Sequence, residues 1–243
     1  MPGRDRAFVL AGVAGISVLA WAWLLAMPAG GDMMSMRAWG AADFWLMFLM
    51  WAVMMVGMMV PSAAPMALMY AAVVRKAERQ GAVLAPTAVF VAGYVLAWTL
   101  FSVAATLAQW GLDRAALLSP MMVSTSPVLG GLLLIGAGVY QLTPWKDACL
   151  EHCRAPARFM AEHWRPGVAG ALRMGMQHGF FCLGCCWVLM GLLFFGGVMN
   201  LLWIAAITLF VLLEKMLPTG ARAGRFAGVA LVSLGAWVLV GSA

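Results

Sequence analysis

The chain has 243 residues, of which 65% are hydrophobic and only 10% are charged, and its formal net charge is +6. Soluble domains carry roughly 25% charged residues, so this composition excludes an ordinary soluble protein and predicts an integral membrane protein. The positive charge gives no reason to expect a nucleic-acid partner, because the basic residues lie in the loops between apolar runs. The five cysteines lie between residues 149 and 186 and do not resemble a secreted disulfide framework.

The first two apolar runs of the chain are predicted membrane spans. The run 8–27 follows a short basic head. We expect it to be an uncleaved span, because it is long for the core of a signal peptide. The run 44–74 is longer than one span requires, and Pro61 and Pro65 interrupt it. Prolines within a membrane helix kink it and free backbone carbonyls.

Five more apolar runs follow, which gives about seven spans in all. They cover about 86–108, 127–142, 172–195, 201–217 and 226–240. The longest polar stretch, 143–170, lies between the fourth and fifth spans and is too short for an independent domain. The chain is therefore predicted to be all-α, a polytopic membrane helix bundle in which residues 1–243 form a single integral membrane domain.

The basic residues predict the orientation of this bundle. With the N-terminus inside, every lysine and arginine except Arg37 and Arg114 falls in an inner segment. Inner loops of membrane proteins carry such an excess of basic residues. We therefore expect the N-terminus inside and the C-terminus outside, with the 143–170 loop on the reducing side, where thiolates are available as ligands.

The fifth span carries the most informative pattern of the chain. At about 100° per residue, His178, Cys182, Cys185 and Cys186 share about one third of the helix circumference. An imidazole and three thiols on one stripe are soft ligands that suit Cu(I), and zinc is the second metal they allow. The alternative is that the cysteines pack as small apolar residues and a carbonyl satisfies the histidine.

A second set of ligand-type side chains lies in the inner loop. Cys149, His152 and Cys153 have the spacing of one face of a helical turn. We consider two interpretations, an inner metal-transfer site and an ordinary surface turn.

Methionine is abundant, with 21 residues. Met47, Met50, Met54 and Met58 repeat on one face of the second span, where Met54 and Met58 are the auxiliary ligands we predict. Thioethers bind soft metals weakly, although methionine also packs well in helix interfaces. A second methionine group lies in the preceding outer loop and would collect metal there; it consists of Met33, Met34 and Met36.

Two adjacent charged residues end the sixth span. Glu214 and Lys215 are either a salt-paired helix end whose lysine reaches the interface, or partners of the metal site. In the second interpretation Glu214 accepts protons or supports a ligand.

Five short motifs together resemble a bacterial family of predicted metal-binding integral membrane proteins, which is linked to copper delivery to a polyphenol oxidase of the tyrosinase type. They are MMVPSAAP (58–65), YQLTPWKDACLEHCRAP (140–156), GMQHGFFCLGCCWVLM (175–190), GGVMNLLWIA (196–205) and LLEKMLP (212–218). The resemblance implies a multi-pass protein of the bacterial cytoplasmic membrane with a copper-chaperone role. The matching positions are Met58, Met59, Pro61, Pro65, Lys146, Cys149, Cys153, Arg154, His178, Cys182, Cys185, Cys186, Glu214 and Lys215.

These observations favour a Cu(I) chaperone, loader or permease in the lipid bilayer, which exchanges copper with a donor or acceptor protein. One alternative is a membrane thiol oxidoreductase that uses Cys182 and Cys185, since a C-x-x-C spacing supports dithiol chemistry. Another is a structural subunit of a membrane complex. We assign no catalytic residue, and the direction of transfer and the oligomeric state stay open.

Overall fold

The computed structural model describes residues 3–27, 39–119 and 122–241. Within these residues the regular structure is helical, apart from one antiparallel bridge between Leu118 and Ser124. The helices are α1 (Gly3–Ala26), α2 (Ala41–Met59), η1 (Pro61–Ala63), α3 (Ala64–Arg79), α4 (Thr87–Arg114), α5 (Pro127–Gln141), α6 (Pro144–Arg154), α7 (Pro156–His163), α8 (Gly167–Gly191), α9 (Leu193–Gly196), α10 (Leu201–Met216) and α11 (Gly220–Gly241). The all-helical prediction is confirmed.

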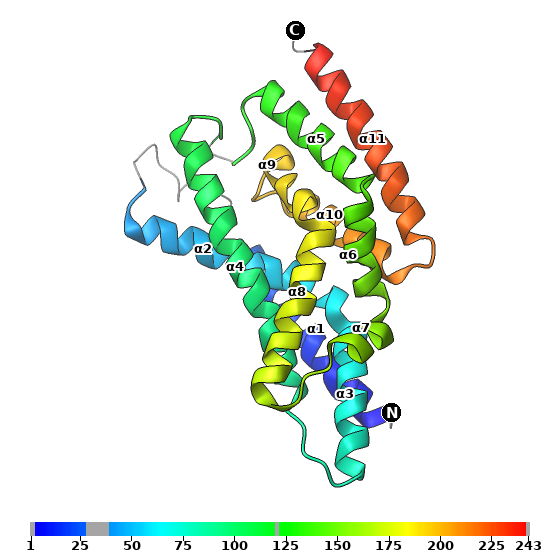
Figure 1. The fold of residues 1–243 in the computed structure, drawn as a ribbon. Coiled ribbons are helices and arrows are strands. Elements are labelled where there is room, and N and C mark those ends of the chain that lie inside the picture. The colour runs from blue at the N-terminus through cyan, green and yellow to red at the C-terminus, as the bar shows by residue number, and fades with distance from the viewer. Residues whose placement is uncertain (1–2, 28–38, 120–121, 242–243) are drawn as a thin grey trace.

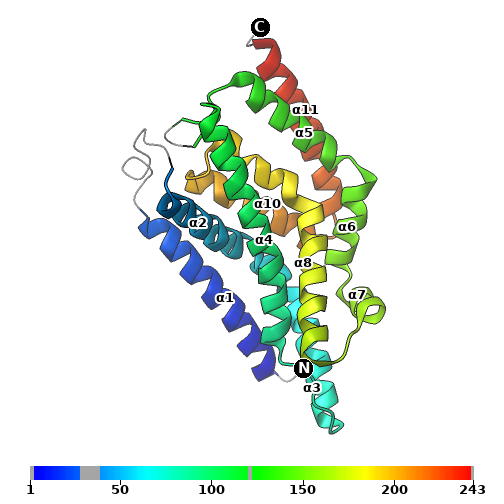
Figure 2. The same ribbon diagram turned by 60° about the vertical axis from the view of Figure 1, so that its left-hand side comes forward.

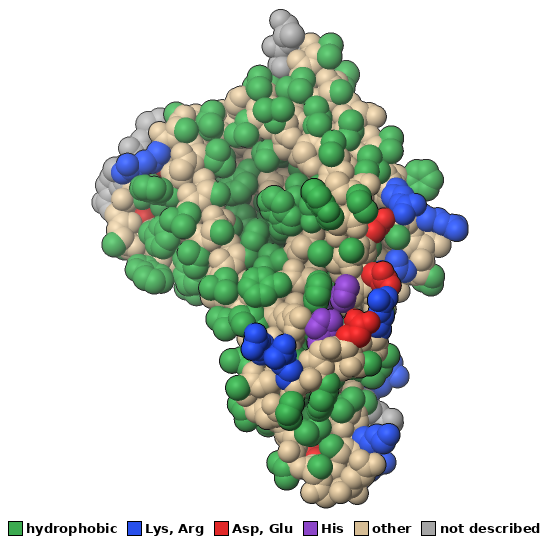
Figure 3. Space-filling view, in the orientation of Figure 1, with side chains coloured by type: hydrophobic (Ala, Val, Ile, Leu, Met, Phe, Trp, Pro, Cys, Tyr) green, Lys and Arg blue, Asp and Glu red, His purple; other side chains and the backbone are tan. Residues whose placement is uncertain are grey.

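Several of these helices can cross a membrane. Among the described residues five are long and apolar enough, and a sixth span is obtained if α5 and α6, bent by 63°, are counted as one. The helix α10, with 16 residues, is shorter than those five. Hydrophobic side chains cover most of the face shown in Figure 3, while charged side chains gather at its lower part and edges. The count of seven and the orientation stay predictions.

The second predicted span is broken where its prolines predict a break. The helix α2 ends at Met59, η1 forms one tight turn, and α3 continues to Arg79. The Met59 carbonyl, freed at this break, accepts hydrogen bonds from Ser62 Oγ at 2.8 Å and from Tyr94 Oη at 2.9 Å. Side chains thus satisfy backbone that the prolines released, as a break inside an apolar bundle requires.

Glycines allow two helix pairs to pack closely. The helices α4 and α8 lie against each other, as do α5 and α11 (Figures 1 and 2). A Cβ atom added at Gly93 would collide with the Leu172 carbonyl, and one added at Gly175 would collide with the Phe90 carbonyl. Small residues at such contacts let two backbones approach. This packing holds α8, which carries the predicted metal stripe, against α4.

The polar stretch expected between the fourth and fifth spans is largely helical. It forms α6 and α7, and α6 packs along α8. Lys146 and Leu150 are the buried residues of α6. The cysteines of α6 are thereby brought beside those of α8.

Replacing Gly175 by alanine should destabilise the bundle, because its methyl group has no room beside the Phe90 carbonyl. Overpacking of this kind costs roughly 1–3 kcal/mol. Gly191→Ala, in the same helix with no neighbouring atom within 4 Å, is the matched control and should be neutral or stabilising. Thermal unfolding in detergent measures both, and equal melting temperatures would contradict the close approach of α4 and α8.

Candidate functional site

The centre of the site is the thiol of Cys182 on α8. Lys215 Nζ of α10 donates a hydrogen bond to Cys182 Sγ at 2.8 Å and another to Ser62 Oγ at 3.2 Å. Tyr94 Oη of α4 lies 3.0 Å from the same sulfur. The thiol, the ammonium and the phenol are all buried. Three helices, α4, α8 and α10, therefore meet at this sulfur atom, and η1 reaches it through Lys215.

The other two cysteines of the predicted stripe lie one turn further along α8. The thiols of Cys185 and Cys186 each donate to the Cys182 carbonyl at 3.0 Å. Cys186 Sγ also lies 4.0 Å from Met59 Sδ of α2. All three cysteines are about 1% exposed, so this end of the stripe faces protein rather than lipid.

The cysteines of α6 complete this group. The thiol of Cys153 interacts with those of Cys182 and Cys185, and the thiol of Cys149 interacts with Cys185. Gly184 makes room for Cys149, whose sulfur lies 2.6 Å from the place a Cβ atom would occupy. We call this set the thiol cluster; it consists of the free cysteines Cys149, Cys153, Cys182, Cys185 and Cys186. The sequence predicted two separate cysteine sets, and the packing of α6 on α8 joins them.

His178 lies on the same helix, in an aromatic environment. Its ring packs against those of Phe90, Tyr94 and Phe159, with centroids 6.2, 5.6 and 5.4 Å away. The residue is 2% exposed, and no hydrogen-bond partner of its Nδ1 is found among the described residues. A buried polar atom without a partner is costly, so this nitrogen is available to a ligand that enters the site.

The third member of the inner-loop set, His152, faces elsewhere. Its ring stacks on Phe181 at 4.1 Å, and its Nδ1 lies 2.8 Å from the Ala148 carbonyl. Cys153 is the neighbour in sequence that reaches the thiol cluster. Within the described ranges, no group of three or more His, Cys, Asp or Glu side chains is arranged to hold a metal ion. The metal-ligating roles therefore stay predictions.

The methionine stripe of α2 is buried in the same core as the thiol cluster. Met54 and Met58 are 0% and 1% exposed. At the far end of the stripe, Gln109 Nε2 donates to Met47 Sδ at 3.5 Å and to Met122 Sδ at 3.0 Å. The predicted collecting group, Met33, Met34 and Met36, lies outside the described residues.

Glu214 and Lys215 do not pair with each other. Glu214 forms a buried ion pair with Lys146 of α6, whereas Lys215 contacts Cys182. Lys215 is 7% exposed, so its side chain is buried within the helix bundle. A Cβ atom at position 224 would crowd the Glu214 carboxylate, so a larger residue there would displace this side chain. No local sequence signal identified Lys146 as the partner of Glu214.

Removing one member of the Lys146–Glu214 pair should destabilise the protein strongly. Breaking a buried ion pair leaves an uncompensated charge and typically costs about 3–5 kcal/mol. We expect Lys146→Met alone to lower the melting temperature markedly, and Lys146→Met with Glu214→Gln to restore most of it. A double variant no more stable than the single one would argue against the pair.

No match was found among the curated proteins or among the solved structures. The family model of the PpoB2 copper chaperone matches residues 48–238, which span α2 to α11 and include every cysteine and histidine of the chain. The resemblance carried by the sequence motifs is thereby confirmed, and the chain belongs to the PpoB2 copper chaperone family.

Proposed function

We propose that this protein is a membrane copper handler that binds Cu(I) through Cys182, Cys185 and Cys186. His178 is a further ligand, and Cys149 and Cys153 approach from α6. Membership of a copper chaperone family supports copper as the metal that is bound. The observation that carries the site is the buried contact between Lys215 Nζ and Cys182 Sγ at 2.8 Å.

The charge of the bound ion explains why a lysine belongs at this site. A Cu(I) ion held by two thiolates carries one net negative charge, which an apolar interior penalises strongly. The Lys215 ammonium cancels it. Before metal binds, the same ammonium favours the thiolate form of Cys182, which is the form that ligates metal. Cys185 or Cys186 would supply the second thiolate and release its proton when copper enters.

The methionines supply a route of weaker ligands to this site. The stripe runs from Met47, beside Met122, to Met59, whose sulfur faces Cys186. Thioethers bind Cu(I) without deprotonation, so Met54 and Met58 would pass the ion along rather than retain it. The geometry fits movement in either direction.

The membrane arrangement we propose has seven spans, with the N-terminus inside and the C-terminus outside, in the cytoplasmic membrane of a bacterium. The bias of basic residues supports it. It is also supported by α1 beginning at one end of the molecule and α11 finishing at the other (Figures 1 and 2), as an odd number of crossings requires. The acceptor we propose is a copper enzyme of the polyphenol oxidase kind, following the family resemblance.

One observation also favours the thiol oxidoreductase as a second candidate. An ammonium beside Cys182 would activate this thiol as a nucleophile, with Cys185 three residues away to resolve a mixed disulfide. Alkylation of metal-free protein after oxidation separates the two functions. A reversible mobility shift that requires both Cys182 and Cys185 would favour dithiol chemistry, and its absence under strong oxidant would exclude it.

Changing Cys182, Cys185 and Cys186 together to serine should remove the copper that the protein retains through purification, because hydroxyl oxygen is a poor ligand for Cu(I). The measurement is elemental analysis of detergent-purified protein expressed with added copper. Met66→Leu, in a buried core apart from the thiol cluster, is the control and should keep its copper. A triple variant that elutes as a folded protein with full copper content would rule out this site.

Lys215→Leu should lower Cu(I) affinity about tenfold, equivalent to about 1.4 kcal/mol. Leucine removes the ammonium without supplying a thioether, and it leaves the bis-thiolate complex with an uncompensated charge. Lys76→Leu removes the same charge from an exposed position of α3 and is the matched control. Competition against a Cu(I) chelator measures both variants, and equal affinities would refute the role of Lys215.

A further inference from the structure

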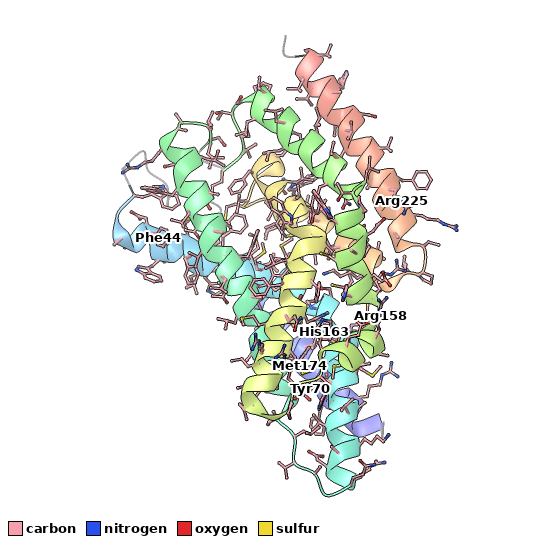
Figure 4. The ribbon with its side chains drawn as sticks, viewed as in Figure 1. Phe44, Tyr70, Arg158, His163, Met174 and Arg225 are labelled. Carbon is pink, nitrogen blue, oxygen red and sulfur yellow. The ribbon has the colours of Figure 1, made fainter. Side chains whose placement is uncertain are left out.

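Two histidines outside the thiol cluster lie side by side at the surface. The rings of His152 on α6 and His163 at the end of α7 have centroids 6.0 Å apart and planes at 72°. Both residues are partly exposed. Figure 3 shows histidine side chains next to acidic ones on this face, and Figure 4 shows His163 near the lower end of α6. The function proposed above gives His163 no role.

Each imidazole is fixed in orientation by the ring beneath it. His152 stacks on Phe181 at 4.1 Å with planes 5° apart, and His163 stacks on Phe159 at 4.7 Å with planes 15° apart. The two phenylalanines in turn meet edge to face at 6.2 Å. Four rings therefore form one packed unit, in which neither imidazole turns freely.

The hydrogen bonds of these rings determine which nitrogen is available. His152 Nδ1 lies 2.8 Å from the Ala148 carbonyl, and His163 Nδ1 lies 3.2 Å from the Phe159 carbonyl. A carbonyl can only accept, so each Nδ1 carries the hydrogen and each neutral ring keeps its lone pair on Nε2. Metal-ligating histidines are commonly held in this way, with the second nitrogen anchored to a carbonyl.

We propose that His152 and His163 form a second copper site, at the surface, which binds Cu(I) through the two Nε2 atoms and exchanges it with the thiol cluster. This proposal rests on the copper function proposed above and adds the place where the ion enters or leaves. Two neutral imidazoles bind Cu(I) less tightly than thiolates do, so the surface site would release its ion readily in either direction.

The surrounding charges favour a cation at this position. A small recess beside His152 is lined by Glu151, Ala155, Arg158 and Phe159. Arg158 is held by both Glu151 and Glu162, so the three charged groups leave one net negative charge. Glu162 precedes His163 in the chain, so this net negative charge lies beside the histidine pair and attracts a positive ion.

One aromatic ring separates this surface pair from the buried site. Phe159 stacks on His163 and also meets the ring of His178 edge to face at 5.4 Å. His178 in turn interacts with Cys182, one helical turn away on α8. Its unpartnered Nδ1 would be the intermediate ligand between surface and core. The three histidines thus form a path from the recess to the thiol cluster.

The test exploits the fact that the chain has only three histidines. The full chain, labelled with ¹³C at histidine Cε1, is purified in detergent micelles and titrated with Ag(I), a redox-inert d¹⁰ substitute for Cu(I). In a variant with all five cysteines changed to serine, the His152 and His163 signals should shift together and saturate at one equivalent. When His152→Phe, which keeps the stack on Phe181, is added to this variant, the response of His163 should weaken at least tenfold.

The proposal is overturned if His163 responds equally well in His152→Phe, or if neither signal responds in wild type. His152→Ala repeats the measurement should the phenylalanine variant fold poorly, and His178→Ala should leave the paired response intact. The two proposals can fail separately. A response of the surface pair in a protein that retains no copper overturns the thiol site alone, whereas bound copper without the paired response overturns the surface site alone.

Discussion

The contact between the Lys215 ammonium and the Cys182 thiol is the constraint on which the rest of the site depends. An ammonium buried among apolar helices needs an anionic or strongly polar partner, and the described neighbours of Lys215 Nζ are Cys182 Sγ and Ser62 Oγ. Ser62 can reach it only because the proline break ends α2 and starts η1. The Lys215 ammonium therefore connects the break near Pro61, in the first half of the chain, with the Cys182 thiol on α8 in the second half.

Adjacent residues of α10 divide two tasks between them. Glu214 faces α6 and forms a buried ion pair with Lys146, which fixes one helix on another. Lys215 faces α8 and holds a thiol, a partner whose charge changes when a proton or a metal ion leaves. Because successive residues of a helix point about 100° apart, this separation needs no distortion of the backbone. In our proposal the first pair is structural, and the second responds to copper.

The sequence predicted the features that depend on local periodicity. These are the helices, the interruption by Pro61 and Pro65, and the single stripe of α8 that Cys182, Cys185 and Cys186 share. It did not predict the contacts between helices: Lys146 with Glu214, Cys153 with Cys182, and His152 with His163. Nothing in the spacing of residues 146 and 214 indicates that they meet, because their distance is set by the packing of α6 and α10. We expected a partner for His178 on another helix, but its Nδ1 has none among the described residues.

The helix α6 is the element that would couple the two copper sites. His152 and Cys153 are consecutive, yet the first lies on Phe181 near the surface and the second reaches the thiol cluster. Both ends of α6 are tied down: Arg225 pairs with Asp147 at 3.0 Å near its start, and Arg154 donates to the Leu217 carbonyl at 2.7 Å at its end. Because His152 and Cys153 are consecutive residues of one helix, a shift of Cys153 on copper entry would also move His152.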